Sequence, residues 1–388
     1  MSGPKVLLPG ATLGVMGGGQ LGRMFVHAAQ RMGYFTAVLD PDESSPAGRV
    51  SHHHVRADYL DEIGLATLCG HAQAITTEFE NVPADALARL AQHRDVAPGA
   101  AAVAIAQDRA LEKAHFVRCG VDCAPHAVVT NEEEVASVDD DLLPGILKTA
   151  RLGYDGKGQA RVRTRAELRA AWEQLGRADC VLEKLLPLAF ECSVVVARGH
   201  DGAMVHLPVQ RNLHREGILA VTEVHEGCIP DAQAHRAIAA ARRIADGLDY
   251  VGVLCVEFFG LEDGSLVVNE MAPRPHNSGH WSMDAADVSQ FELQVRTLAG
   301  LPLVQPRQHS AAVMLNLLGD LWFARGAAEA TPDWAGVLAL PGAHLHLYGK
   351  LSARKGRKMG HLTLTGPTPA AARETALAAA RQLGIATF

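Results

Sequence analysis

The sequence predicts a mixed α/β and α+β protein with several domains. Near the N-terminus, short apolar segments alternate with a helical one, which is the order that produces a parallel sheet. Further along, pairs of apolar runs separated by short turns indicate antiparallel hairpins. The chain has 388 residues, too many for one compact core, so we expect two or three domains.

Composition and charge exclude several classes of protein. The chain is 48% hydrophobic and 20% charged, as ordinary globular proteins are. Its net charge of -7 gives no sign of a nucleic-acid surface, so an anionic ligand must meet local basic clusters. No secretory signal and no bilayer-spanning apolar run is apparent. The seven cysteines form no CxxC pair, which indicates free thiols. We therefore expect a soluble cytoplasmic protein that binds neither nucleic acid nor membranes.

The first region is predicted to be a Rossmann-like domain. Residues 13–16 form a strand, 21–32 a helix, 35–39 a second strand and 74–77 a further strand. Between the first strand and the helix, three glycines match G-x-G-x-x-G, namely Gly17, Gly19 and Gly22. This pattern alone suggests a dinucleotide site. Nothing later in the chain supplies a partner for nicotinamide, so we favour a turn that binds no NAD and keep the loop as a contact for a substrate phosphate.

A small α+β lid is predicted over residues 125–198. Its elements are a strand ending at Lys148, a helix at 165–176, and strands at 181–184 and 191–197.

A glycine-rich loop, Gly-Tyr-Asp-Gly-Lys-Gly at 153–158, lies between two of these strands and lacks the Walker A arrangement. Such a loop can close over a triphosphate and offer backbone N–H groups to its oxygens. Lys148 is placed to neutralise phosphate charge. The alternative is a surface hairpin with incidental charges.

Two glutamates interrupt strongly apolar strands in the remaining region. Glu257 lies in the predicted strand 251–259 and Glu270 directly follows the strand 265–269. Hairpin pairing would bring both side chains to one face, where burial is costly unless a cation or hydrogen bonds meet them. With Asn269 they offer the hard oxygen ligands that Mg²⁺ prefers. The alternative is a pair of buried glutamates bound to arginine or lysine.

Two further groups carry polar chemistry. The loop after Glu270 holds four side chains suited to anion binding and proton handling: Arg274, His276, Asn277 and Ser278. A basic cluster follows near the C-terminus: Lys350, Arg354, Lys355, Arg357 and Lys358. It is either a site for a phosphate monoester or a solvated hairpin, and its position in the chain does not decide between them.

Taken together, these motifs resemble the 5-(carboxyamino)imidazole ribonucleotide synthases, a family of ATP-grasp ligases of purine biosynthesis. The resemblance extends from Gly17 to His361 and is most specific in four sequence segments, at 153–159, 212–219, 269–281 and 289–292. It implies an ATP-grasp fold of three domains: a Rossmann-like domain at 1–124, a lid at 125–198, and a larger domain with the metal site at 199–388. It also implies a homodimer.

The resemblance also implies a role for individual residues. ATP contacts are Arg109, Lys148, Gly153, Tyr154, Asp155, Gly156, Lys157, Gly158, Glu183, Lys184, Leu185, Leu186, Glu191, His214, Asn269 and Glu270. The ligands of Mg²⁺, with Mn²⁺ as an alternative, are Glu257 and Glu270. Contacts to 5-aminoimidazole ribonucleotide are Gly19, Gln20, Tyr154, Asp155, Lys350 and Arg357. Bicarbonate contacts are Arg274, His276, Asn277 and Ser278. One departure is Leu152, where the family usually has glycine.

The implied reaction forms carboxyphosphate from bicarbonate and ATP and transfers the carboxy group to the exocyclic amine of the ribonucleotide. Lys148 would stabilise charge, Arg274 would hold the carboxy group, and His276 or Asp155 would manage the proton. Three rivals remain: a ligase for formate or another acid, an NAD-binding oxidoreductase, and a nucleotide sensor without turnover.

Overall fold

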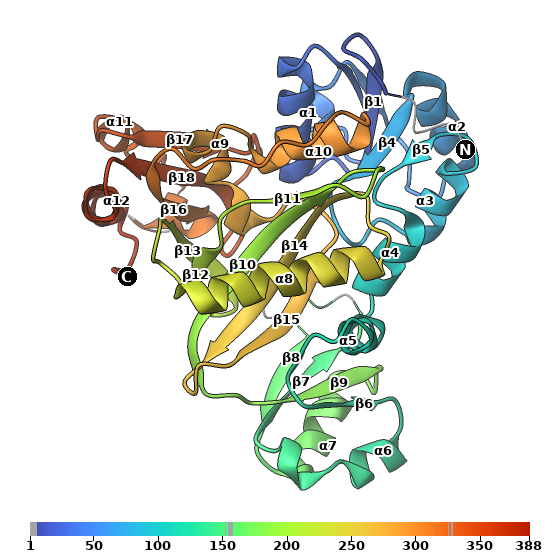
Figure 1. Cartoon of the computed structure of the whole chain (residues 1–388), viewed down its shortest axis with the longest axis vertical. Helices are drawn as coiled ribbons and strands as arrows, with labels where there is room; N and C mark the ends of the chain where they lie inside the picture. Colours follow the sequence, from blue (N-terminus) through green and yellow to red (C-terminus); the bar gives the residue numbers. More distant parts are fainter. Residues whose placement is uncertain (1–5, 152, 154–157, 325, 327–328) are drawn as a thin grey trace.

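The computed structural model describes residues 6–151, 153, 158–324, 326 and 329–388. These residues form a five-stranded, a four-stranded and a nine-stranded sheet. The three sheets belong to different parts of the molecule, and helix α5 (Arg109–Arg118) lies between the four-stranded sheet and the other two (Figure 1). The mixed α/β and α+β class is confirmed.

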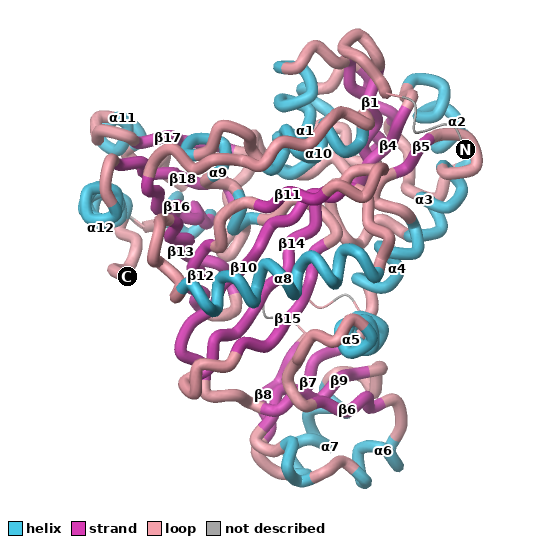
Figure 2. The backbone as a smooth tube through the Cα atoms, viewed as in Figure 1, coloured by secondary structure: helices cyan, strands magenta, loops and turns pink. Residues whose placement is uncertain are grey.

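The N-terminal sheet is parallel, as predicted, with the order β3-β2-β1-β4-β5. Its strands are β1 (Thr12–Met16), β2 (Phe35–Leu39), β3 (His53–Val55), β4 (Ala74–Thr77) and β5 (Asp95–Val96). Its helices are α1 (Gln20–Arg31), η1 (Gly48–Val50), α2 (Glu62–His71), α3 (Ala84–Leu90) and α4 (Ala100–Ala106). Helices cover both faces of this sheet, which is the doubly wound arrangement (Figure 2).

The lid has a small antiparallel sheet of order β6-β9-β7-β8. Its strands are β6 (His126–Val129), β7 (Gly145–Thr149), β8 (Gln159–Val162) and β9 (Cys180–Lys184), and its helices are α6 (Glu132–Ser137), η2 (Asp140–Leu142) and α7 (Arg165–Gln174). Leu168 and Trp172 of α7 pack on Leu147 and Leu182 of the sheet and give the lid its own core.

The nine-stranded sheet has the order β15-β14-β10-β12-β13-β16-β18-β17, with β11 paired to β10. Its strands are β10 (Leu188–Arg198), β11 (Met204–His206), β12 (Gln210–Arg215), β13 (Ile218–Val224), β14 (Gly252–Leu261), β15 (Leu266–Ala272), β16 (Ala311–Leu318), β17 (Ala343–Leu347) and β18 (Lys358–Gly366). The strand predicted at 191–197 is β10, but its placement in the lid was wrong. It pairs with β14 over ten register positions, from Leu188–Leu261 to Arg198–Gly252, so it belongs to the large sheet.

Helices cover the large sheet and join it to the N-terminal part. They are α8 (Asp231–Gly247), η3 (Asn277–Gly279), α9 (Ser282–Ala285), α10 (Gln290–Leu298), η4 (Gly319–Phe323), α11 (Trp334–Leu338) and α12 (Pro369–Leu383). Ile244 of α8 is buried against Val256 of β14. Phe291 of α10 shares a core with Phe25 of α1.

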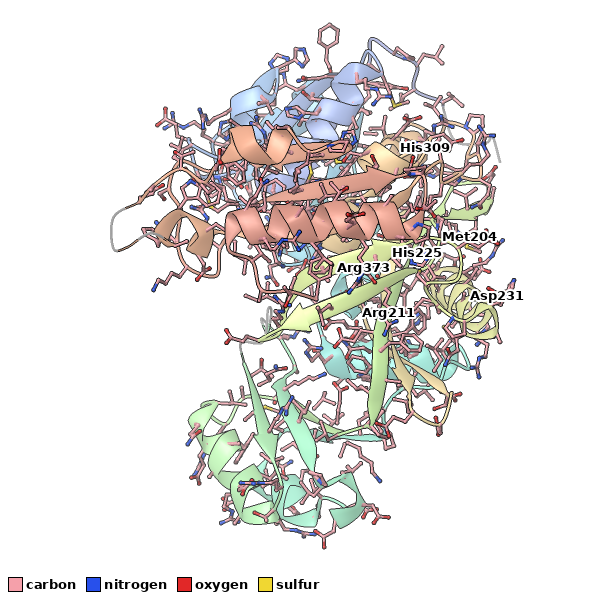
Figure 3. All side chains as sticks on the ribbon, turned by 90° about the vertical axis from the view of Figure 1, so that its left-hand side faces the viewer. Met204, Arg211, His225, Asp231, His309 and Arg373 are labelled. Carbon is pink, nitrogen blue, oxygen red and sulfur yellow. The ribbon has the colours of Figure 1, made fainter. Side chains whose placement is uncertain are left out.

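The C-terminal helix α12 closes the far end of the large sheet. Its Ala376 packs with Leu362 of β18. Arg373, labelled in Figure 3, pairs with Glu223 of β13 and lies 5.2 Å from the ring centre of Phe388. Among the described residues, the helices fall short of the length and apolarity that spanning a bilayer requires.

Candidate functional site

A cavity of ≈ 590 Å³ lies where the lid, α5, the large sheet and the loop after β4 meet. Its walls contain many of the residues that the sequence singled out. They are Arg109, Lys148, Gly153, Glu191, His214, Glu257, Asn269, Glu270, Arg274, His276 and Asn277. These positions come from segments separated by more than a hundred residues, and the fold brings them to one hollow.

Glu257 and Glu270 are direct neighbours across the β14–β15 hairpin, as the sequence predicted. They are register partners, and a bulge follows between Glu257 and Phe258. Arg109 Nη1 lies 3.0 Å from Glu270 Oε2, so the alternative of an arginine partner is also realised for this carboxylate. Arg109 lines the same cavity as Glu257 and Glu270, so this ion pair leaves both glutamates facing the site.

The two carboxylates are both buried, but their neighbouring charges give them different pKa values. Burial raises the pKa of Glu257 to about 7, with His214 opposing the shift and Glu270 adding to it. Burial also opposes ionisation of Glu270, but the charges of Arg109 and Lys148 outweigh it and lower the pKa of Glu270. Glu257 Oε1 is buried without a hydrogen-bond partner among the described residues. Two adjacent carboxylates, one with such an oxygen, fit a divalent cation with oxygen ligands.

One face of α5 carries three charged side chains into this region, at spacings of three and four residues. Arg109 contacts Glu270, Glu112 Oε1 accepts the backbone N–H of Met271 at 2.7 Å, and Lys113 Nζ lies 3.1 Å from Glu183 Oε2. Glu112 and Lys113 are functional candidates that the sequence reasoning missed. Their i, i+3, i+4 spacing was the available signal, since it places all three side chains on one side of a helix.

Glu183 lies behind the cavity wall and holds two lysines. Its Oε1 is 3.0 Å from Lys148 Nζ and its Oε2 is 3.1 Å from Lys113 Nζ. The neighbouring ATP candidates Lys184, Leu185 and Leu186 lie at and just after the end of strand β9 and do not line the cavity. Lys148 therefore lines the cavity with an ammonium group that Glu183 holds in place.

The loop after β15 carries four of the predicted site residues, and their side chains make different contacts. Arg274 pairs with Glu80, and Asn277 has both side-chain amide atoms buried without a hydrogen-bond partner in the described part of the chain. His276 Nδ1 lies 2.9 Å from Ser278 Oγ, and its Nε2 lies 3.4 Å from Glu257 Oε1. Ser278 itself is fully buried and bonds Ser193. It orients His276, and its predicted contact with a carboxy ligand is not supported.

A second acid–imidazole pair also lines the cavity. Glu191 of β10 and His214 of β12 are hydrogen-bonded through Nδ1 of the imidazole. Burial opposes protonation of His214, but the hydrogen bond that it donates to Glu191 and the nearby charges of Glu257 and Glu270 outweigh this effect and raise the pKa of the histidine. The wall therefore offers a cationic or hydrogen-donating group to an anion in the cavity.

The glycine turn before α1 already has a carboxylate at its amide groups. Glu78 accepts the N–H of Gly19 at 2.8 Å and that of Gly22 at 3.0 Å. The predicted phosphate contact through these amides was wrong, because the side chain of Glu78 occupies the helix N-terminus. The same contact argues against a dinucleotide there. Gly19 and Gln20 do not line the ≈ 590 Å³ cavity.

The basic cluster near the C-terminus lies beside α1 and reaches the cavity through Lys358. Lys350 Nζ donates to the carbonyl of Lys358 at 2.5 Å, and Arg357 Nη1 donates to the carbonyl of Ser352 at 2.9 Å. Arg49 Nη1 donates to the carbonyl of Gly349 at 3.2 Å. The N-terminal part thus adds basic groups that the sequence reasoning missed.

Part of the predicted glycine loop lies outside the described residues. These positions are Leu152, Tyr154, Asp155, Gly156 and Lys157. Of its two described glycines, Gly153 lines the cavity. Gly158 cannot be replaced without strain, because its φ is +70° and an added Cβ would lie 2.6 Å from Thr149 Oγ1.

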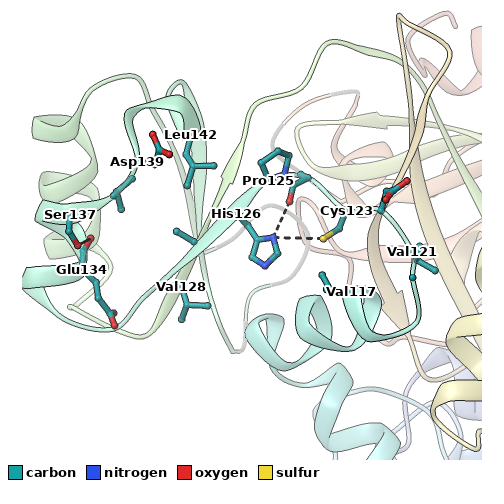
Figure 4. Close-up of a pocket in the computed structure, with 15 residues that line it drawn as sticks. Val117, Val121, Cys123, Pro125, His126, Val128, Glu134, Ser137, Asp139 and Leu142 are labelled. Carbon is teal, nitrogen blue, oxygen red and sulfur yellow. Dashed lines mark hydrogen bonds between the residues drawn. The ribbon is translucent and has the colours of Figure 1, made fainter.

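A second hollow, of ≈ 660 Å³, lies between the end of α5 and the lid (Figure 4). Its titratable lining is Asp122, Cys123, His126, Glu134 and Asp139. His126 Nδ1 lies 3.0 Å from the carbonyl of Ala124 and 3.8 Å from Cys123 Sγ. With carboxylates and no lysine or arginine in its described lining, this hollow does not suit a triphosphate.

Comparison with known proteins gives consistent results along the chain. Three family models match: a ribonucleotide synthetase preATP-grasp domain at 10–107, an ATP-grasp domain at 114–291, and a phosphoribosylaminoimidazole carboxylase C-terminal domain at 312–375. The N5-carboxyaminoimidazole ribonucleotide synthase of Brucella melitensis is 44% identical over 364 residues, covering 93% of this chain and 98% of the relative. The Bacillus subtilis enzyme of that name is 39% identical over 360 residues, covering 92% of each.

Solved structures agree with these relatives. An ADP complex of an N5-carboxyaminoimidazole ribonucleotide synthetase matches with a TM-score of 0.90 and 38% identity, covering 99% of this chain and 98% of the other. The Aspergillus clavatus N5-carboxyaminoimidazole synthase, in complex with ADP and 5-aminoimidazole ribonucleotide, matches with a TM-score of 0.87 and 30% identity, covering 97% of this chain and 100% of the other.

Proposed function

The chain belongs to the N5-carboxyaminoimidazole ribonucleotide synthase family of ATP-grasp ligases, and from this membership we propose how its cavity carboxylates 5-aminoimidazole ribonucleotide. ATP and bicarbonate are the co-substrates, and the products are 5-carboxyamino-1-(5-phosphoribosyl)imidazole, ADP and phosphate. The observation that carries the proposal is the convergence of the Glu257–Glu270 pair, Lys148 and the 274–277 loop on one cavity.

The first step is attack of a bicarbonate oxygen on the γ-phosphorus of ATP. The bond to the β,γ-bridging oxygen breaks, ADP leaves, and carboxyphosphate forms. Lys148 would offset the charge that develops on the phosphates, and Arg109 and His214, which also line the cavity, would add donors. Glu257 and Glu270 would hold Mg²⁺, with Mn²⁺ as an alternative, and this ion supplies positive charge against the phosphate oxygens.

The second step joins carbon to nitrogen. The exocyclic amine of the ribonucleotide attacks the carbon of carboxyphosphate, or carbon dioxide released from it, and phosphate leaves. Arg274, fixed by Glu80, holds the carboxy group, and Asn277 offers its buried amide. Closure of the lid excludes water that would hydrolyse the intermediate.

His276 acts as a hydrogen-bond donor in this scheme. The backbone N–H of Ser278 lies 3.3 Å from its Nδ1, which makes that nitrogen the acceptor and leaves the proton on Nε2, toward Glu257. Burial, together with the charges of Arg274 and Lys358, holds the pKa of His276 well below its usual value, so the ring is neutral. Of the two groups considered for the amine proton, this arrangement favours Asp155 as the acceptor.

The ribonucleotide is assigned to the region between α1 and the β17–β18 loop. Lys350 and Arg357 would grip its 5-phosphate, with Gln20 and Tyr154 beside it. The carbonyl contacts of Lys350 and Arg357 hold this loop in place and support the assignment.

The proposal also includes the division into domains at 1–124, 125–198 and 199–388, changed in one respect: β10 belongs to the large sheet, so the lid ends before Leu188. A homodimer and a cytoplasmic location complete the proposal. The described cysteines are free thiols, which suits a reducing compartment. Sedimentation analysis tests the dimer separately from the activity.

Phosphate release from ATP tests the reaction directly. We expect release that requires bicarbonate and increases when 5-aminoimidazole ribonucleotide is added. Stimulation by formate in place of bicarbonate would favour the rival ligase. Binding of ATP without release under any of these conditions would favour a nucleotide sensor.

A further inference from the structure

A cluster of imidazoles and one carboxylate lies outside the nucleotide cavity. His344 and His346 lie two residues apart on β17, so they share one face of the strand, and His361 is the register partner of His346 on β18. Asp284 of α9 approaches the same face. We call these four residues the Asp–His cluster.

The contacts within the Asp–His cluster are close. His346 Nε2 lies 2.9 and 3.1 Å from the two oxygens of Asp284, and His344 Nδ1 lies 3.8 Å from Asp284 Oδ1. The rings of His346 and His361 stack with centres 4.5 Å apart. One ligand atom from each of Asp284, His346 and His361 lies within 4.8 Å of the others.

His361 provides an independent observation. The residue is fully buried, and its Nε2 has no hydrogen-bond partner among the described residues. Its Nδ1 lies 3.0 Å from the hydroxyl of Tyr348. In the tautomer whose Nδ1–H donates to the Tyr348 hydroxyl, Nε2 carries the lone pair, which is the arrangement found in histidines that bind metals.

We propose that Asp284, His346 and His361 bind Zn²⁺, with His344 as a fourth ligand. Imidazole and carboxylate ligands in fourfold coordination suit Zn²⁺, whereas Mg²⁺ prefers oxygen ligands alone, so this site differs in kind from the Glu257–Glu270 pair. Tetrahedral ligands lie about 3.3 Å apart at zinc–nitrogen distances. The side chains of His344 and His346 are 42% and 26% exposed, so these rings have room to turn toward an entering ion.

The position of this site suggests its effect. Asp284 follows the 274–281 loop, and the two strands of the hairpin flank the loop of Lys350 and Arg357. A bound ion would tie both substrate-binding loops together without contacting either substrate.

Zinc titration of the whole protein tests the proposal. The chain is first treated with chelator, dialysed, and saturated with Mg²⁺ and ADP so that the catalytic cavity is occupied. Calorimetric titration should then show that each chain binds one Zn²⁺ ion tightly. We expect Asp284→Asn and His344→Ala to weaken this binding by about 100-fold and about 10-fold, and Tyr348→Phe to weaken it by about 10-fold through the orientation of His361.

His309→Ala is the matched control, since its exposed side chain (Figure 3) contacts Ser310 and is not among the four residues of the cluster, so its loss should leave the titration unchanged. Co²⁺ in place of Zn²⁺ should give the visible absorption of fourfold coordination, which His344→Ala should remove. Should Asp284→Asn fail to fold, His344→Ala at a partly exposed position and the near-isosteric Tyr348→Phe still show whether the Asp–His cluster binds Zn²⁺. Absence of a tight equivalent in the unmodified protein would overturn the proposal, and so would equal affinity in the cluster variants and the control.

Discussion

At the scale of single residues, one buried carboxylate organises the positive charge near the proposed site of the nucleotide phosphates. Glu183 contacts both Lys113 and Lys148, and Lys113 Nζ also donates to the carbonyl of Asn269 at 2.8 Å. The Lys113 side chain is fully buried. Because Asn269 precedes Glu270, Lys113 connects the lid strand β9 with the strand that carries the proposed metal ligand. Two parts of the site thus depend on one ammonium group that lies outside the lining of the cavity.

Replacement of Lys113 by methionine should lower the free energy of unfolding by about 3 kcal/mol, because it leaves buried polar partners without their cation. Denaturant unfolding measures this change. Lys355→Met, at an exposed position of the same residue type, should change the stability by about 0.5 kcal/mol or less. Equal effects of the two substitutions would contradict a special role for Lys113.

Glu183 should make the protein sensitive to acid. Burial opposes ionisation of Glu183, but Lys148 and Lys113 outweigh it and lower the pKa from 4.5 to about 2. A lowered folded-state pKa contributes stability that is fully present above pH 4.5 and is lost as the pH falls toward 2. The contribution at neutral pH is about 3 kcal/mol. The difference in unfolding free energy between the unmodified protein and Glu183→Gln should therefore shrink between about pH 5 and pH 2, and a constant difference would refute the assignment.

At the scale of elements, hairpins position the chemistry. The pairing of β14 with β15 could be predicted, because a short turn between two apolar runs fixes which residues lie opposite each other. The inward face of α5 could not be predicted with the same ease. Charges at helical spacing usually face solvent, and only the packing of α5 between the lid and β15 makes Arg109, Glu112 and Lys113 internal.

Gly319 is a second element-scale feature, because it supports the loop between β17 and β18. A Cβ at this position would lie 2.1 Å from the carbonyl oxygen of Arg354, and the Gly319 N–H donates to the carbonyl of Arg357 at 2.8 Å. Gly319→Ala should therefore displace the loop and raise the KM for the ribonucleotide by about 10-fold, equivalent to one lost contact of about 1.4 kcal/mol.

The KM for ATP is the internal control of that experiment, since Gly319 does not line the nucleotide cavity. Gly356→Ala is a matched substitution in the same loop, where an added Cβ meets no atom within 4 Å, although its φ of +70° disfavours a side chain. An unchanged KM for the ribonucleotide in Gly319→Ala would argue that the loop is not its site.

At the scale of the whole molecule, the position of a strand could be predicted from local sequence, whereas its place in the strand order of a sheet could not. Local patterns located β1, β2, β4, β7 and β9 to within a few residues, but they gave no bounds for β3, β5, β6 and β8. The membership of β10 depends on its long-range pairing with β14, which no local pattern reveals. The same holds for Arg49 and Gly349, which lie 300 positions apart in the sequence and share a hydrogen bond. Contacts of this kind follow from topology, so the basic groups contributed by the N-terminal part could not be found in advance.

The whole account depends on a divalent cation shared by Glu257, Glu270 and the nucleotide. Binding of Mn²⁺ in the presence and absence of ADP measures this most directly, with Asp284→Asn as the background, because this substitution is expected to weaken ion binding at the Asp–His cluster most. We predict one ion per chain that requires the nucleotide, and loss of that ion in Glu257→Gln and Glu270→Gln with the circular dichroism of the fold unchanged. Retention of nucleotide-dependent Mn²⁺ binding in both variants would contradict the account.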